Sequence, residues 1–295
     1  MIIVRLWGGL GNQMFQYATG RRLAGIHGTR LILDTSRLAA ADTPREFELG
    51  YFRIAAEPAT EAERDLCAQL ERRRRKPLCR MMEKAGLLPR LSGFFYYRER
   101  SFTFDERVLA LSDNVCLDGY WQSEKYFREI RDTLTREFIP RGEFSEVNRR
   151  LAREMEACDS VSLHVRRGDY VSNPAAARYH GTCDLDYYAR AMEEIAKRVA
   201  APRIFVFSDD PEWASANLRL PLPATVIGHN GASGCGDDMS LMRLCRHHII
   251  ANSSFSWWGA WLSRNPGKTV IAPARWFNEA GLDTRDLIPR DWLRI

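Results

Sequence analysis

The second half of the chain alternates between short apolar runs and stretches in which apolar residues recur at helical spacing. The apolar runs end at turn residues and have the length of buried strands, and the stretches between them have the length of ordinary helices. This alternation is typical of a parallel, doubly wound sheet covered by helices on both faces. Predicted strands cover 161–165, 203–208, 224–228, 248–252 and 269–273, and predicted helices follow Asp184 or cover 211–218, 238–245 and 254–263.

The N-terminal part of the chain opens in a similar way. Residues 2–6 predict a strand and 29–34 a second one. The segment between them places Met14, Tyr17 and Ala18 on one helical face. This order of strand, loop, helix and strand indicates a second α/β domain.

The middle of the chain is less regular. The pattern is hard to read over 40–110, whereas 114–121 predicts a strand and 124–138 a helix. A length of 295 residues is enough for two domains. We expect an α/β protein of two Rossmann-type doubly wound domains that cover 1–157 and 158–295, with a C-terminal tail that can pack back on the first domain.

The composition is that of a soluble globular protein, with 45% hydrophobic and 27% charged residues. No window approaches the ~18 consecutive apolar residues of a membrane span. The N-terminal sequence MIIVRLWGG lacks the basic start and the long apolar region of a signal peptide. We therefore expect a cytoplasmic protein without a signal peptide or a transmembrane segment.

The cysteines and the net charge indicate which kinds of site and ligand to expect. The chain has seven cysteines, an odd number without CxxC spacing, so a disulfide framework or zinc site is not expected. The net charge of +5 mildly favours an anionic ligand or surface. A basic run at Arg72, Arg73, Arg74, Arg75 and Lys76 is most often a solvated face, and a peripheral membrane or polyanion contact is the minority interpretation.

The loop GGLGNQ at 8–13 resembles the start of a dinucleotide-binding fingerprint, with Gly9 and Gly11 in place. Met14 replaces the third glycine, and Asp34 comes close to the usual spacing of the acidic residue without matching it. A site for NAD is therefore weakly supported. A tight turn and a loop that lets a backbone approach a ligand stay equally open.

The segment HVRRGD at 164–169 is the strongest signal. Arg166 and Arg167 leave an apolar strand at its carboxyl end, where ligands bind in doubly wound sheets. Guanidinium groups are planar and permanently charged, which suits a phosphate. Asp169 can orient an arginine or accept a proton, and His164 shares a face of the strand with Arg166.

Three more polar clusters follow predicted strands. SDDP at 208–211 and GDDMSL at 236–241 read as helix starts, with Asp237 or Asp238 as the cap of the second. An aspartate there can also accept the N–H donors of a guanine. Ser253 and Ser254 open a helix directly after a buried strand, which favours a phosphate site over simple capping, whereas the tryptophans that follow are expected in the core.

The sequence CDLDYY contains the spacing of an aspartate pair that can bind a metal. Asp184 and Asp186 lie in the first turn of a well-patterned helix, where acidic groups complement the helix dipole. We interpret both as structural. Because an arginine pair can neutralise a phosphate by itself, no metal site and no cofactor are expected.

Together these blocks resemble the α-1,2-fucosyltransferases of glycosyltransferase family 11. The resemblance runs over nearly the whole chain but is poor over 55–105, where acceptor choice is expected to reside. It implies a GT-B-like fold with a cleft between two Rossmann-type domains, GDP-L-fucose as donor, inversion at the anomeric carbon and no metal. The blocks that carry it are GGLGNQMFQYA, GYWQSEKYF, HVRRGDY, FSDD and NSSFSWWGAWL.

The resemblance also implies roles for single residues. By similarity to the α-1,6- and protein O-fucosyltransferases, Arg166 would hold the β-phosphate, supported by Arg167 and Asp169. The glycine-rich loop would face the fucose and the acceptor with Gly9, Gly11, Asn12 and Gln13. The other implied donor contacts are His164 and Asp238 at ribose or guanine, Asp209 at the donor, and Ser253, Ser254 and the Phe255 amide at phosphate oxygens.

The expected reaction is the transfer of L-fucose to the 2-hydroxyl of a galactoside, in the setting of a surface glycan. Asp169 is the first candidate for the general base, and a mechanism without a strong base stays open because pairing with arginine lowers a carboxyl pKa. Two other classes stay open: another nucleotide-dependent enzyme, such as a dehydrogenase, and a non-catalytic binder of nucleotide sugars or polyanions.

Overall fold

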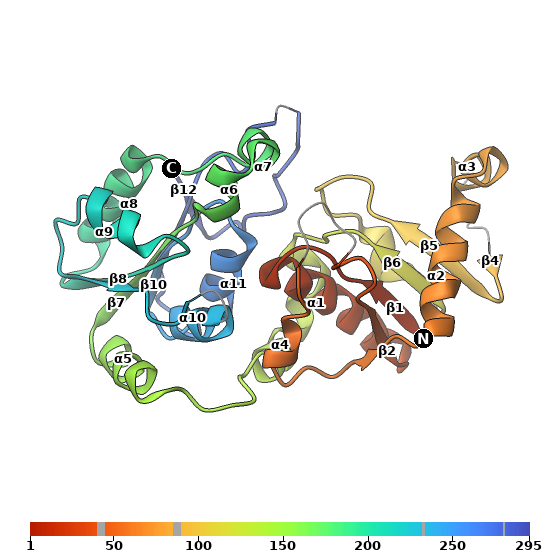
Figure 1. Ribbon diagram of the computed structural model, residues 1–295, viewed down its shortest axis with the longest axis horizontal. Helices are drawn as coiled ribbons and strands as arrows, with labels where there is room; N and C mark the ends of the chain where they lie inside the picture. Colours follow the sequence, from red (N-terminus) through yellow and green to blue (C-terminus); the bar gives the residue numbers. More distant parts are fainter. Residues whose placement is uncertain (40–44, 85–89, 232–233, 280) are drawn as a thin grey trace. The chain divides into compact units, whose positions relative to one another are not determined.

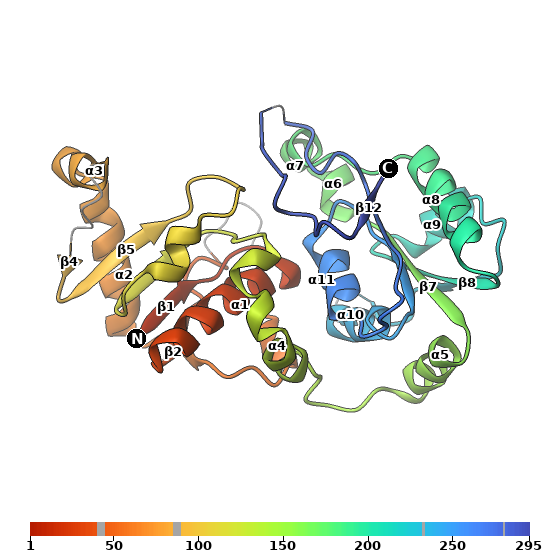
Figure 2. The ribbon, with the colours of Figure 1, turned by 180° about the vertical axis from the view of Figure 1, so that it is seen from behind.

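The computed structural model describes residues 1–39, 45–84, 90–231, 234–279 and 281–295. The chain forms two compact units (Figures 1 and 2). Unit 1 comprises Met1–Phe138 with Arg285–Leu287, and unit 2 comprises Ile139–Thr284 with Ile288–Ile295. The division therefore falls earlier than residue 157, and a short part of the C-terminal region belongs to unit 1.

Unit 1 contains a six-stranded sheet in the order β3-β2-β1-β6-β5-β4. All neighbouring strands are parallel except the pair of β4 and β5. β1, β2 and β6 lie where the sequence predicts strands, whereas the others fall in the segment that was hard to read. The strands are β1 (Ile2–Arg5), β2 (Leu31–Asp34), β3 (Glu57–Pro58), β4 (Arg90–Leu91), β5 (Phe94–Arg98) and β6 (Val115–Asp118).

Helices cover both faces of the unit 1 sheet. α1 (Leu10–His27) packs on β1 and buries Met14 and Tyr17 completely. α2 (Glu61–Arg74) covers the other face with its buried residues Cys67 and Leu70. The remaining segments are α3 (Pro77–Lys84), α4 (Arg131–Glu137) and the 3-10 turns η1 (Leu49–Tyr51), η2 (Glu106–Ala110), η3 (Glu124–Tyr126) and η4 (Arg128–Ile130).

Unit 2 contains a six-stranded sheet in the order β12-β11-β10-β7-β8-β9, and every neighbouring pair is parallel. This confirms the doubly wound sheet predicted from the alternating pattern. Only the last strand was not expected. The strands are β7 (Asp159–Val165), β8 (Pro202–Ser208), β9 (Ala224–Ile227), β10 (His247–Ile249), β11 (Val270–Ala272) and β12 (Leu293–Arg294).

The strands of unit 2 send alternate side chains to two separate cores, as the pleat of a strand requires. Ile204 and Val206 join the core under α8 (Leu185–Arg198), whereas Phe205 and Phe207 join the core that contains Leu241 of α10 (Cys235–Met242). In both views α8 lies beside α9, and α10 beside α11. The other helices are α5 (Glu146–Ala157), α6 (Gly168–Ser172), α7 (Pro174–Tyr179), α9 (Pro211–Asn217) and α11 (Ser254–Leu262).

The position of α5 explains why the units divide before residue 157. Its buried residues Leu151 and Met155 pack in the same core as Phe205 and Phe207 of β8. The helix therefore covers the sheet of unit 2, although it precedes the first strand of that sheet in the sequence. Among the described helices, none has both the length and the hydropathy of a membrane span.

Candidate functional site

Asp209 organises the arginine turn that follows β7. Its carboxylate pairs with the Arg166 guanidinium at 2.8 Å and accepts a hydrogen bond from the Arg167 amide at 2.8 Å. A Cβ atom on Gly168 would lie 2.5 Å from Asp209 Oδ2, so only glycine leaves room for this carboxylate. β7 and β8 are parallel neighbours, which brings the ends of both strands to the same edge of the sheet.

The second arginine is held by a different set of contacts. Arg167 stacks over the Trp213 ring, with its guanidinium carbon 3.7 Å from the ring centroid, and its Nε lies 3.3 Å from Asp210. Asp210 is also the N-cap of α9, because it accepts a hydrogen bond from the Trp213 amide at 3.1 Å. The predicted helix start at SDDP is confirmed. The two adjacent aspartates therefore do different things: Asp209 braces the turn, and Asp210 caps a helix.

His164 is buried on β7 and lies beside the start of α11. The residue is only 4% exposed. The centroid of its ring lies 5.4 Å from the centroid of the Phe255 ring. Burial and the nearby Arg166 charge lower the pKa of His164 to about 3, so the ring is neutral. Its Nδ1 has no hydrogen-bond partner within the described part of the chain.

The N-terminus of α11 carries the serines that were predicted to hold phosphate. Ser253 is the N-cap, and its hydroxyl accepts a hydrogen bond from the Phe255 amide at 3.3 Å. Ser254 is partly exposed at the first helical position. The tryptophans that follow are confirmed as core residues, since Trp257, Trp258 and Trp261 are at most 1% exposed.

Asn252 is a supporting residue that sequence reasoning missed. Its amide group donates to the carbonyl oxygens of His180, Gly181 and Trp276, each at 3.1 Å. Asn252 directly precedes Ser253, the N-cap of α11. Its one buried side chain therefore connects three backbone positions in other loops to the start of this helix. Its place between a buried strand and the two serines was the available signal.

Asp238 lies in a polar cluster at the start of α10. It accepts a hydrogen bond from Asn230 at 2.7 Å, and Asn148 joins Asn230 to Asp237. Burial, and then the charge of Asp237, raise the pKa of Asp238 to about 6, although the Asn230 bond lowers it. The prediction that an aspartate caps this helix was wrong. The N-cap is Gly234, because the helix begins before the aspartates and places both in its first turn.

The side chain of Asp169 lies outside the described part of the structure. Only the backbone of this residue, which belongs to α6, is described. Its role as base or brace therefore stays a prediction. The backbone of α6 continues directly from the arginine turn. Arg166 lies over Tyr170 of this helix, with its guanidinium carbon 5.3 Å from the ring centroid.

The glycine-rich loop of unit 1 is held from the inside by Gln13. This side chain is fully buried, donates to the carbonyl oxygens of Gly8 and Glu46, and accepts from the Glu48 amide. Gln13 thus braces the loop and does not face outward as predicted, because both ends of its amide are used within unit 1. Gly8 has a φ of +79°, which makes it the glycine that the turn requires.

The other residues predicted in this loop differ in exposure. Gly11 is buried within α1, and Gly9 is its partly exposed N-cap. Asn12 is partly exposed and accepts a hydrogen bond from Gln122 at 2.8 Å. This bond links the block GGLGNQ to the block GYWQSE within unit 1, which the sequence did not indicate.

Asp34 does not take the place of a ribose-binding acid. It is fully buried, forms an ion pair with Arg5 at 3.3 Å, and accepts a hydrogen bond from the Ser36 amide at 2.9 Å. Arg5 in turn bonds Glu71 of α2 at 2.7 Å. Burial opposes the charge of Glu71, but hydrogen bonds from Arg5, Arg75 and Arg37 hold its pKa at about 2. This network is structural and argues against a dinucleotide site.

Comparisons with known proteins agree on one family. The model of glycosyl transferase family 11 matches residues 75–295. The O-antigen biosynthesis glycosyltransferase WbnK of Escherichia coli is 33% identical over 98% of this chain and 99% of that protein. An alpha-1,2-colitosyltransferase of the same species is 33% identical over 100% of this chain and 99% of its own length. The chain belongs to glycosyl transferase family 11.

More distant members and a solved structure extend this result. Galactoside alpha-(1,2)-fucosyltransferase 2 of Mus musculus is 27% identical over 50% of the chain and 45% of its own length. A mutant of Arabidopsis thaliana FUT1 in complex with GDP superposes with a TM-score of 0.55 at 12% identity, over 92% of this chain and 69% of that one. The GT-B-like fold of two Rossmann-type domains is confirmed, and this family 11 protein is a glycosyltransferase.

The basic run of this family 11 protein lies at the end of α2 and beyond it. Arg75 pairs with Glu71 at 2.7 Å, whereas the side chains of Arg72, Arg73 and Lys76 are exposed and have no partner among the described residues. The following helix, α3, exposes 63% of Leu78 and 63% of Met81.

The aspartate pair of CDLDYY is structural, as predicted. Asp184 is the N-cap of α8 and accepts a hydrogen bond from the Tyr187 amide at 2.7 Å, and Asp186 lies in the first turn. Within the described ranges, no group of three or more acidic, histidine or cysteine side chains is placed to hold a metal ion.

Proposed function

We propose that this protein transfers L-fucose from GDP-β-L-fucose to the 2-hydroxyl of a galactoside, with inversion and without a metal. The observation that carries the proposal is the arginine turn at the carboxyl end of β7, braced by Asp209 beside the N-terminus of α11. Family membership supports transfer to a galactoside, because relatives are named as α-1,2-fucosyltransferases. The setting is the synthesis of a surface glycan.

The arginine turn supplies the charge that a departing diphosphate needs. Negative charge grows on the β-phosphate as the bond to fucose C1 breaks, and Arg166 stabilises that charge more strongly in the transition state than in the ground state. Its ion pair with Asp209 fixes the guanidinium before the donor binds. Arg167, Ser253, Ser254 and the Phe255 amide hold the remaining phosphate oxygens.

The nucleoside is bound by His164 and by the cluster around Asp238. A carboxylate can accept both N–H donors of the guanine edge, and these donors stabilise its ionised form. The raised pKa of Asp238 reflects a buried carboxyl group that gains from such a partner. Neutral His164 offers its unpartnered Nδ1 to a ribose hydroxyl.

The acceptor proton leaves through Asp169 or directly to solvent in a dissociative reaction. The partly exposed Gly9 and Asn12 of the glycine-rich loop face the fucose and the acceptor. A profile of rate against pH for the wild type and Asp169→Asn separates the two routes, since only a catalytic base gives an acidic limb that the variant loses.

A second donor has support of its own. The relative that covers the whole chain at 33% identity is named as an alpha-1,2-colitosyltransferase. Colitose is the 3-deoxy analogue of L-fucose, so the two donors differ by one hydroxyl group. A site that bonds this hydroxyl strongly rejects the analogue that lacks it. Competition between GDP-fucose and GDP-colitose therefore decides the donor.

We also propose that the enzyme works in the cytoplasm and touches an anionic membrane surface through Arg72, Arg73 and Lys76. All seven cysteines are unpaired thiols, which supports a reducing compartment. The exposed Leu78 and Met81 next to the basic run add an apolar contact to the charge.

The direct test is incubation of the full chain with GDP-L-fucose and lactose, with release of GDP as the readout. We expect acceptor-dependent release that Arg166→Ala reduces by about a hundredfold or more. Arg128→Ala, an exposed arginine on η4, is the control and should leave the rate unchanged. Absence of release with both sugar nucleotides would support a non-catalytic binder. A fluorescence titration with a nicotinamide nucleotide tests the alternative that the protein is a dehydrogenase.

A further inference from the structure

Tyr170 connects the arginine turn to His180, a residue with no role in the reaction so far. Arg166 lies over the Tyr170 ring, with its guanidinium carbon 5.3 Å from the ring centroid. The same ring stacks on the imidazole of His180, with centroids 4.5 Å apart and planes 3° apart. His180 follows α7 directly and lies outside the blocks that carry the family resemblance. A series of contacts therefore runs from His180 through Tyr170 to Arg166.

Two different contacts restrain the Arg166 guanidinium. Its Nη1 pairs with Asp209 at 2.8 Å, and the Tyr170 ring lies within the ~6 Å over which an aromatic face attracts a cation. A single ion pair leaves a planar group able to turn about that contact, whereas a ring beside it limits this movement. The orientation of Arg166 therefore depends on where the Tyr170 ring lies.

The backbone of His180 is held in place from the start of α11. Asn252, which is 4% exposed, donates to the carbonyl oxygens of His180 and Gly181, each at 3.1 Å. Asn252 also directly precedes Ser253, the N-cap of α11. His180 is thus tied through its carbonyl group to the second element that is proposed to bind phosphate.

The imidazole of His180 is held by neighbouring rings. Tyr179 packs edge to face against it with centroids 4.8 Å apart, and the buried Phe277 lies at 5.6 Å. The Asn278 amide donates to the Tyr179 carbonyl oxygen at 2.9 Å, which joins these segments through the backbone as well. Because the imidazole is fixed in this way, it can fix the ring that stacks on it.

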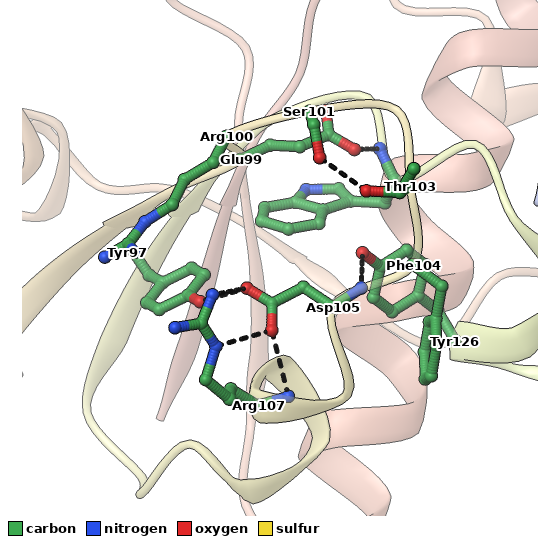
Figure 3. Close-up of a pocket in the computed structure, with 10 residues that line it drawn as sticks. Tyr97, Glu99, Arg100, Ser101, Thr103, Phe104, Asp105, Arg107 and Tyr126 are labelled. Carbon is green, nitrogen blue, oxygen red and sulfur yellow. Dashed lines mark hydrogen bonds and ion pairs between the residues drawn. The ribbon is translucent and has the colours of Figure 1, made fainter. Parts of the chain in front are cut away.

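The aromatic cluster at the cavity of unit 1 shows the contrasting case (Figure 3). Its rings Trp121 and Tyr126 pack edge to face at 5.7 Å and are each 1% exposed. Asp105 and Arg107, which Figure 3 shows bonded to each other, form an ion pair at 2.7 Å. These contacts pack unit 1 and leave the two rings without a surface for a ligand. Tyr170, in contrast, is partly exposed next to a proposed phosphate ligand.

We propose that His180 is a positioning residue, which fixes the Tyr170 ring and thereby holds Arg166 in the orientation that binds a diphosphate. The proposal rests on the proposed function, because that function assigns the β-phosphate to Arg166. His180 itself touches no substrate. Its effect is therefore specific to the second phosphate of the nucleotide, and a nucleoside monophosphate, which lacks this group, is bound without it.

The first experiment measures the Kd for GDP and for GMP by titration calorimetry in the wild type, His180→Ala and Tyr170→Leu. We expect each variant to weaken GDP by about fivefold to tenfold and to leave GMP unchanged. His180→Phe keeps a ring on Tyr170 and should restore most of the affinity for GDP.

His247→Ala is the matched control for the loss of a histidine in unit 2. His247 is partly exposed at the start of β10, at the opposite edge of the sheet from the arginine turn. Its replacement should leave both dissociation constants unchanged. Unchanged GDP affinity in His180→Ala and Tyr170→Leu would overturn the proposal. Equal weakening of GDP and GMP would indicate a general structural role and would overturn it as well.

The second experiment asks whether His180 acts through Arg166 during transfer. His180→Ala should lower kcat for fucose transfer by about tenfold with the KM for lactose unchanged, and it should have no further effect in an Arg166→Ala background. A further tenfold loss in the double variant would overturn the proposal and leave the proposed function in place. Selective weakening of GDP in a protein that transfers no fucose would support the positioning role and contradict the proposed function.

Discussion

Asp209 links three consecutive residues of the arginine turn, although the sequence shows it only as one of two acids before a proline. It pairs with Arg166, accepts from the Arg167 amide and occupies the space that a side chain on Gly168 would need. Space and not backbone angle requires a glycine at position 168, since its φ lies outside the left-handed region. Asp209 is therefore a positioning residue for the two arginines.

Replacing Gly168 with alanine should displace Asp209 and misplace the arginines. A misplacement of about 1 Å costs roughly a hundredfold in rate, so we expect kcat to fall by that order in both Gly168→Ala and Asp209→Ala. Gly142→Ala is the matched control, because a Cβ atom there meets nothing within 4 Å. Asp209→Asn keeps the acceptor for the Arg167 amide and should retain more activity than Asp209→Ala. Equal rates for Gly168→Ala and Gly142→Ala would contradict this role.

His164 should make the fold sensitive to acid. Its pKa is about 3 in the fold and ~6.5 in the unfolded chain, so only the unfolded state takes up a proton between these values. The free energy of unfolding is therefore unaffected by His164 above pH ~6.5. It decreases as the pH falls from ~6.5 toward 3, because the unfolded chain binds a proton that the folded protein does not. Urea unfolding of the wild type and His164→Gln should show a difference that changes by up to ~1.4 kcal/mol per pH unit in this window. A difference that does not vary with pH would contradict the assignment.

At the scale of elements, the sequence predicted unit 2 better than unit 1 for a physical reason. β7, β8 and β10 are buried on both faces, so their apolar runs are continuous and easily recognised. The predicted helix over 124–138 instead breaks into η3, η4 and α4, and the adjacent Tyr126 and Phe127 are both buried where the break occurs.

Contacts between distant segments could not be predicted from the sequence. The arginine turn was predicted from residue type and from its place at a strand end, but its brace by Asp209 depends on the pairing of β7 with β8. Gln13 was assigned to the fucose and acceptor side by the resemblance of its glycine-rich loop to the family block. Its carbonyl and amide partners at Gly8, Glu46 and Glu48 exist only in the folded loop.

The segment from α2 to α3 yields a prediction about membranes. Its basic residues and exposed apolar side chains should bind vesicles that contain an anionic lipid and not vesicles of phosphatidylcholine alone. Co-sedimentation should fall severalfold in the triple variant Arg72→Glu, Arg73→Glu and Lys76→Glu. The control triple Arg128→Glu, Arg136→Glu and Arg141→Glu makes the same change in net charge at other exposed positions. Equal loss in both variants would indicate a general charge effect and no specific surface.

At the scale of the whole molecule, two separate segments of the chain, Met1–Phe138 and Arg285–Leu287, form unit 1. Asp286 accepts hydrogen bonds from the Lys125 ammonium group and from the Phe104 amide, the latter at 2.9 Å. Burial opposes the charge of Asp286, but these partners lower its pKa below the usual range. Residues 285–287 therefore complete unit 1 beside Phe104, and neither unit is built from one continuous stretch of chain.

The structure of the product formed from GDP-β-L-fucose and lactose tests the central claim most directly. NMR of the purified trisaccharide reports both the anomeric configuration and the linked position. The account predicts an α-linked fucose on O2 of galactose, formed by the wild type and reduced by about a hundredfold or more in Arg166→Ala. A β-linked product, a linkage to another hydroxyl, or free fucose as the sole product would contradict it.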